Sequence, residues 1–130
     1  MITISELENA IRDSWDASTS SYQDDWSKDN PSYGQCAVTA LVLNDYLGGE
    51  IVWANVELPD GKFESHYFNK VLGEEKDLTR EQFPEGSIVP KGVPKCKDFA
   101  STREYVLSYP VTQQRYAILK ERVDEKVDSY

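Results

Sequence analysis

The spacing of hydrophobic residues predicts an amphipathic helix near the start of the chain. One face of that helix collects four apolar residues, namely Ile4, Leu7, Ile11 and Trp15. Thr3 and Glu6 have the spacing of a capping box, which satisfies backbone N–H groups where a helix begins. We therefore expect a first helix over about residues 4–16. The polar stretch over 17–34 still carries aromatic side chains, so we expect an ordered, packed loop there.

A continuous apolar run predicts a second helix that is buried and begins at or just before Cys36. Residues 35–47 are dense in Ala, Val and Leu and contain no helix breaker. Gly48-Gly49 then supplies a stop, because glycine readily adopts the left-handed conformation found just after helices.

Three short strands are expected to follow as a meander. Residues 51–56 and 63–70 have the β-branched and aromatic content of strands, and a Pro-Asp-Gly turn at 59–61 reverses the chain between them. A second reversal near 72–73 leads into a third strand around 76–79.

The C-terminal third is expected to be irregular and then helical. Proline and glycine over 84–98 suit an irregular surface segment, and Thr112 after Pro110 can start a last helix. One face of that helix carries Tyr116, Leu119, Val123 and Val127. The order of elements predicts one α+β domain over residues 1–130, in which an N-terminal helix and a central cysteine helix pack on a small antiparallel sheet, with a C-terminal helix.

Charge and composition narrow the classes of partner. The formal net charge of −9 disfavours nucleic acid and anionic membranes, because binding to both depends on Lys and Arg. The chain shows no signal peptide and no apolar run near the ~20 residues of a membrane span, so we expect a cytoplasmic protein. One histidine and two separated cysteines do not supply the clustered ligands of a zinc site, and we expect neither a metal nor another cofactor.

The candidate chemistry is that of a thiol. A free thiol has a pKa of about 8.5 and attacks as thiolate, so a reactive cysteine needs help from its surroundings. Cys36 lies where the second helix begins, and the helix dipole there favours negative charge. His66 is the only histidine, and its side chain can accept the thiol proton near neutral pH. Cys36 could equally be a small buried hydrophobe, which is a common fate of free cysteine.

A third residue is expected to orient His66. A hairpin that turns between Val71 and Leu72 places Asp77 opposite His66, whereas a turn centred on Gly73 places Asn69 opposite Asp77, so Asn69 remains a second candidate. For the oxyanion, the backbone N–H of Cys36 is one donor. A side-chain amide from Gln35 or Gln23 is another candidate.

Most of the chain resembles the YunG-like family of small bacterial proteins. The resemblance rests on residues 34–41, 47–51, 65–69, 77–79 and 82–83, with Trp15 and Trp26 before the cysteine and Arg115-Tyr116 in the last helix. Trp26 is therefore a candidate on the substrate side of the site.

The order of a cysteine at a helix start, a histidine on a strand and an aspartate on the next strand is also similar, more distantly, to papain-like and transglutaminase-like enzymes. This resemblance implies a reduced papain-like core, with Cys36 as nucleophile, His66 as base and Asp77 as orienting carboxylate. Papain-like peptidases usually place a glutamine several residues before the cysteine and a tryptophan beside it, whereas here Gln35 and Ala37 flank Cys36. The departures and the short chain favour a small hydrolase, deamidase or acyltransferase over a general protease.

Three hypotheses on function follow. The first is a thiol enzyme that attacks the amide or ester group of a substrate or protein partner through Cys36. The second is a non-catalytic interaction module on a degenerate version of the same fold. The third is an acidic immunity or inhibitor protein that covers a basic partner. The pH dependence of Cys36 alkylation, with and without His66, separates the first two.

Overall fold

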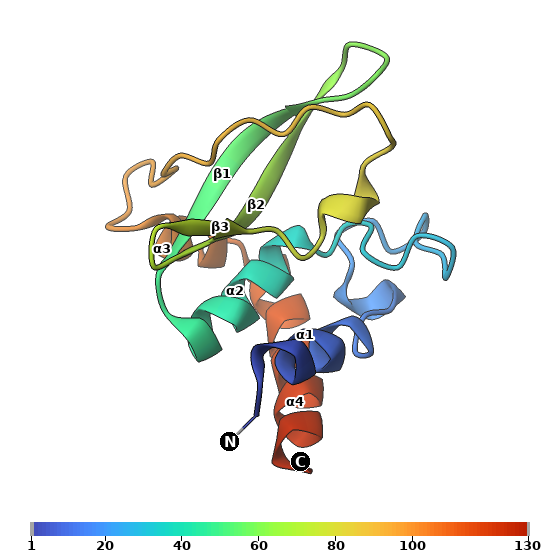
Figure 1. Cartoon of the computed structure of the whole chain (residues 1–130), viewed down its shortest axis with the longest axis vertical. Helices are drawn as coiled ribbons and strands as arrows, with labels where there is room; N and C mark the ends of the chain where they lie inside the picture. The colour runs from blue at the N-terminus through green and yellow to red at the C-terminus, as the bar shows by residue number, and fades with distance from the viewer. Residues whose placement is uncertain (1, 130) are drawn as a thin grey trace.

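The computed structural model describes residues 2–129, in which four α-helices pack with a three-stranded antiparallel sheet (Figure 1). In chain order the elements are α1 (Ile4–Arg12), the short 3-10 turn η1 (Ala17–Thr19), α2 (Cys36–Leu47), β1 (Glu50–Glu57), β2 (Phe63–Val71), β3 (Glu74–Lys76), the turn η2 (Arg80–Gln82), α3 (Thr102–Leu107) and α4 (Pro110–Asp128). The predicted α+β class and the small antiparallel sheet are confirmed. No helix within residues 2–129 combines the length and apolarity needed to cross a membrane.

Helix α1 has the predicted capping box but ends earlier than expected. Thr3 Oγ1 accepts from the backbone N–H of Glu6 at 3.0 Å, and the Glu6 carboxylate accepts from the N–H of Thr3 at 2.9 Å. The helix stops at Arg12 because the chain then turns to extended backbone at Asp16, which caps η1. The turn brings the indole N–H of Trp15 to within 2.9 Å of Thr39 Oγ1 in α2.

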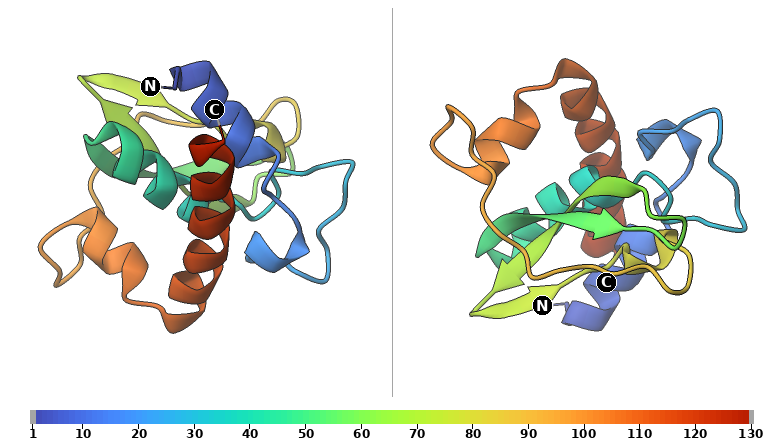
Figure 2. Two further views of the ribbon diagram at one scale, coloured as in Figure 1. Left: turned by 90° about the horizontal axis from the view of Figure 1, so that it is seen from below. Right: turned by 90° about the horizontal axis from the view of Figure 1, so that it is seen from above.

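Helix α2 is the central element of the fold. On one side its residues share an apolar cluster with α1 and α4, and on the other side they share a cluster with β1 and α3. Residues 38–43 are all buried, which confirms the expected buried helix. Figure 2 shows α2 lying between the sheet and α4. A helix covered on several sides must be apolar all round, and the sequence of α2 fits that requirement.

The hairpin between β2 and β3 differs from both registers expected from the sequence. Leu72 and Gly73 have φ values of 52° and 81°, so they form a two-residue turn of the kind that joins twisted antiparallel strands. Asn69 therefore pairs with Lys76, and the strand ends there. Asp77 is the first residue after β3, so it lies opposite neither His66 nor Asn69 in the ladder.

The irregular segment over residues 84–98 follows the free edge of β1. Trp53 and Val93 exchange backbone hydrogen bonds of 2.7 and 2.8 Å, and Glu57 pairs with Ile88 in the same way. The three prolines of this segment cannot donate to a ladder, which explains why isolated bridges form in place of a strand. The expectation of an irregular segment is confirmed, and the segment is joined to the sheet by these bridges.

Helix α4 starts two residues earlier than expected, at Pro110. Proline suits the first position of a helix because its missing N–H would have no partner there. On the predicted apolar face, Leu119 and Val123 are fully buried in the cluster shared with α1 and α2, and Tyr116 and Val127 are partly buried against it. The long α4 thereby supports the opposite side of the cysteine helix.

Candidate active site

Cys36 is the first residue of α2, and the start of this helix has no side-chain cap. Gln35 occupies the cap position with φ −95° and ψ 0°, and its side chain makes no capping hydrogen bond. The first backbone N–H groups of a helix have no partner within the helix. In α2 the first intrahelical bond runs from Thr39 N to Gln35 O, so the N–H of Cys36 has no carbonyl of this helix to bond. The sulfur and this N–H occupy the positive end of the helix dipole.

The approach to Cys36 depends on Gly34. Its φ is +73°, in the left-handed region that favours glycine, and an added Cβ would lie 2.3 Å from Ser20 Oγ. Ser20 Oγ donates to Tyr33 O at 2.8 Å, which ties this bend to the end of η1. A glycine is therefore required two residues before the cysteine.

His66 lies in the middle of β2, opposite Ala54 of β1, and its side chain is 0% exposed. Two aromatic rings hold the imidazole. Phe68 stacks on it at a centroid distance of 5.3 Å, and Phe83 meets it edge-on at 4.8 Å. An imidazole packed in this way has few orientations available.

Asp77 completes the buried pair. Its Oδ2 lies 2.7 Å from Nε2 of His66, and its side chain is 17% exposed. A carboxylate on Nε2 fixes the tautomer and leaves Nδ1 as the nitrogen available to another group. Asp77 reaches the ring from the end of β3, so the contact needs no cross-strand pairing.

The electrostatic surroundings favour the charged form of His66. Burial alone would lower the pKa of the ring, but the hydrogen bond to Asp77 and the interaction with the Cys36 thiol raise it to about 9. Nδ1 nevertheless has no hydrogen-bond partner of good geometry. The sulfur therefore lies beside the ring without an aligned S–H···N hydrogen bond, an arrangement common in catalytic sites before substrate binds.

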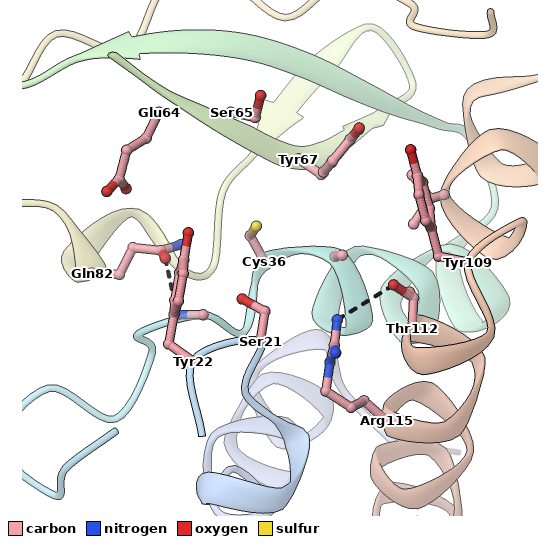
Figure 3. Close-up of a pocket in the computed structure, with 13 residues that line it drawn as sticks. Ser21, Tyr22, Cys36, Glu64, Ser65, Tyr67, Gln82, Tyr109, Thr112 and Arg115 are labelled. Atoms are coloured by element: carbon pink, nitrogen blue, oxygen red, sulfur yellow. Dashed lines mark hydrogen bonds between the residues drawn. The ribbon is translucent and has the colours of Figure 1, made fainter. Parts of the chain in front are cut away.

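Cys36 opens onto a cavity of about 220 Å³ between β2, α4 and the loop that precedes α2 (Figure 3). Its polar and charged lining comes mainly from Ser21, Tyr22, Glu64, Ser65, Tyr67, Gln82, Tyr109, Thr112 and Arg115. His66 and Asp77 are not part of the wall. The cavity thus presents the sulfur to a ligand and keeps the imidazole and its carboxylate behind it.

The remaining candidates from the sequence lie away from this cavity wall. The side-chain amide of Gln35 is buried and donates to Asp16 O at 3.0 Å, and that of Gln23 donates to Ser18 O at 3.4 Å. Asn69 is buried and donates to Ala40 O at 2.9 Å, which attaches β2 to α2. The indole N–H of Trp26 donates to Pro31 O within the same loop.

Among the cavity residues that the sequence did not single out as site residues, Gln82 and Arg115 have side chains suited to bind a ligand. Gln82, in η2, accepts from Gly34 N through Oε1 at 3.2 Å and donates to Thr79 Oγ1 at 3.1 Å, which leaves one N–H of its amide. Arg115, in α4, reaches the cavity from the far end of the sequence. Both belong to the segments that carry the family resemblance, which was the available signal.

The comparisons with known proteins agree on one family. Residues 3–128 match the family model described as YunG protein. The chain is 36% identical over 97 residues to "Uncharacterized protein YunG" of Bacillus subtilis (strain 168), which covers 72% of this chain and 76% of that protein. No solved structure matches the chain at a significant level. The chain belongs to the YunG family.

Proposed function

We propose that this protein is a small thiol enzyme that cleaves or transfers an acyl group through a thioester on Cys36. In this proposal His66 is the general base and acid, and Asp77 orients its ring. The observation that carries the proposal is the fully buried imidazole, with a carboxylate 2.7 Å from Nε2. Asp77 first, and then the neighbouring Cys36 thiol, raise the pKa of this ring.

The same order of elements supports a reduced papain-like arrangement. A cysteine begins a helix, a histidine follows on a strand, and an aspartate comes after the next strand of the meander. The triad is recognised by the roles of its members, and the 2.7 Å contact between His66 and Asp77 is compatible with the orienting role of Asp77.

The reaction proceeds in two halves, first acylation of Cys36 and then transfer of the acyl group to water or an amine. In the reactive pair the thiol proton is already held at Nδ1 of His66, which the raised pKa of the ring favours, and the sulfur attacks the acyl carbon as thiolate while the carbonyl electrons move to oxygen. When the intermediate collapses, the bond to the leaving nitrogen or oxygen breaks, and that atom takes the proton from His66. Water or an acceptor amine then attacks the thioester, gives its proton to His66, and releases the acyl group and the Cys36 thiol.

The negative oxygen of the intermediate needs donors on the cavity side of the sulfur. The uncapped N–H of Cys36 is the first, and the remaining amide N–H of Gln82 is the second. Gln82 is held by Gly34 and Thr79, so its amide is oriented before any ligand arrives. A preorganised donor stabilises developing charge without a cost of reorganisation.

An acyl-enzyme trap tests this function. The protein is mixed with p-nitrophenyl acetate, and release of nitrophenolate is followed with mass spectrometry of the chain. We expect one acetyl group on Cys36, formed in a burst and then lost by hydrolysis. Cys36→Ala should abolish the adduct, and His66→Ala should slow its formation by about 100-fold or more.

Cys96 provides a matched control in the same chain. It is partly buried, and its sulfur lies 3.9 Å from Thr102 Oγ1, outside the candidate site. A Cys96→Ala variant should keep the burst. Acetylation that is equally fast on both cysteines, or that does not depend on His66, would contradict the enzyme and favour the interaction module.

A further inference from the structure

We propose that Arg115 recognises an anionic group of the substrate, so that the acyl compound attacked by Cys36 carries a carboxylate close to the reacting carbon. This inference rests on the proposed function and adds the chemical class of the substrate. The carboxylate would lie toward α4, with the reacting carbonyl over the sulfur.

Arg115 is a half-buried cation on the wall of the Cys36 cavity, yet few of its hydrogen-bonding groups are used. Its Nη2 donates to Thr112 Oγ1 at 3.3 Å, and its Nε is buried with no hydrogen-bond partner. A guanidinium presents five N–H donors in a planar fork that matches a carboxylate. An unsatisfied buried N–H is costly, so a carboxylate that met this fork from the cavity would bind favourably.

The other arginines of α3 and α4 are paired with carboxylates. Arg103 lies 2.8 Å from Asp45, and Arg122 lies 3.0 Å from Asp16. Arg115 forms no ion pair with any residue between 2 and 129. In a chain with a net charge of −9, a cation without a carboxylate partner at a cavity is a distinct feature.

Cys36 and Arg115 share an electrostatic environment. Burial lowers the pKa of the Arg115 guanidinium, and negative charge at Cys36 acts against that shift. An anion that enters the cavity beside the sulfur therefore comes under the influence of Arg115.

The cavity also has a negative end, which would orient a bound anion with its carboxylate toward Arg115. Glu64 and Arg115 lie on opposite sides of Cys36 in Figure 3. Burial and the charge of Glu64 together raise the pKa of Tyr22, so this end of the cavity is unfavourable for an anion. Outside the cavity Arg115 borders an open depression that contains Asp24 and Asp25, but neither carboxylate forms an ion pair with it.

Two alkylating reagents of similar size and different charge test this inference. Iodoacetate and iodoacetamide both transfer a two-carbon group to sulfur and release iodide, but only iodoacetate carries a carboxylate. The measured quantity is the ratio of their rate constants at Cys36 in the Cys96→Ala background at pH 7. We expect this ratio to exceed that of the neutral thiol N-acetylcysteinamide, despite the negative net charge of the protein.

Substitution at Arg115 isolates its contribution. Arg115→Gln should lower the iodoacetate-to-iodoacetamide ratio by at least about tenfold, since a charge within a few ångströms is removed. Any change in the reactivity of the sulfur itself affects both reagents and cancels in the ratio. Arg115→Lys should recover most of the ratio. Lys91→Gln removes one positive charge from an exposed position outside the cavity and should leave the ratio within about twofold.

The outcomes separate this inference from the proposed function. Suppose that Cys36 reacts rapidly with iodoacetamide, that this reaction depends on His66, and that Arg115→Gln leaves the iodoacetate-to-iodoacetamide ratio unchanged. This result would overturn the role of Arg115 and leave the proposed thiol enzyme in place. A Cys36 that reacts with both reagents no faster than Cys96 would overturn both. If Arg115→Gln does not fold, the protein with native Arg115 still tests the inference. An iodoacetate-to-iodoacetamide ratio at or below that of N-acetylcysteinamide would contradict an anion site at Arg115.

Discussion

Asp77 Oδ2 lies 2.7 Å from His66 Nε2, and this contact joins the end of β3 to the middle of β2. Because the ring is fully buried and Asp77 is mostly buried, the pair is little screened by solvent. Removing one partner of such a pair typically costs about 3–5 kcal/mol, since the other is left buried without compensation.

The first prediction concerns the protonation of His66. Its pKa, raised to about 9 by Asp77 and Cys36 against the effect of burial, makes the ring positively charged at neutral pH. A proton NMR titration should show the ring signal moving near pH 9. Asp77→Asn should lower the midpoint by one unit or more, because the amide keeps a hydrogen bond and loses the charge. A midpoint near 6.5 in the native protein would contradict this electrostatic picture.

The second prediction is a pH dependence of stability. His66 binds its proton more tightly in the folded chain than in the unfolded chain, where its pKa is 6.5. The stabilisation is therefore complete below pH 6.5 and is lost as pH rises through about 9; its size is about 3 kcal/mol. Urea unfolding of the native protein should show this decline, and His66→Gln should flatten it. If the free energy of unfolding falls with pH equally in both proteins, titratable groups other than His66 cause the decline.

The third prediction separates acyl transfer from simple nucleophilicity. Alkylation by iodoacetamide creates no oxyanion, whereas attack on p-nitrophenyl acetate does. Gln82→Ala should therefore reduce acetylation of Cys36 by roughly 100-fold, the usual effect of losing one oxyanion donor, and change the alkylation rate by less than about threefold. If the two rates fall in parallel, Gln82 acts by positioning Gly34 and Cys36, and the oxyanion role is wrong.

The fourth prediction concerns Asn69, whose amide holds the carbonyl of Ala40 at 2.9 Å. Asn69→Ala leaves that buried hydrogen bond unmade and should destabilise the protein by about 1–3 kcal/mol. The Cys36 alkylation rate in the folded protein should change by less than about threefold, because Asp77 remains on the ring. Chemical denaturation and alkylation kinetics on the same sample check both parts. A selective loss of reactivity with unchanged stability would return Asn69 to the candidate site.

The elements of the fold followed from local patterns wherever such patterns were strong. The capping box at Thr3, the apolar run of α2 and the turn signals around the strands each predicted the right type of element. The ends of helices followed less well. Helix α1 stops at Arg12 because Asp16 caps η1 through the backbone of Ser18, which is a local contact, and because Trp15 bonds to Thr39 in α2, which is a tertiary contact without a local signal.

The candidate site was harder to derive, because its residues are brought together by turns and distant segments. The register of β2 and β3 depends on which two residues take positive φ, and Leu72 is an unusual choice for that conformation. Gln82 and Arg115 lie 46 and 79 residues after Cys36, counted along the printed sequence, so spacing carries no information about their approach to the cavity. Their roles become apparent only when η2 and α4 are placed around α2.

The proposed chemistry depends above all on the partnership of Cys36 and His66, and alkylation kinetics as a function of pH test that partnership directly. Iodoacetamide rates are measured from pH 5 to 9 on Cys96→Ala, with and without His66→Ala, and the Cys36→Ala chain reports the reactivity of Cys96. We expect Cys36 to react at least about tenfold faster than Cys96 at pH 6, and to lose this advantage without His66. A Cys36 that reacts only after denaturation, or at a rate indifferent to His66, would contradict the central claim.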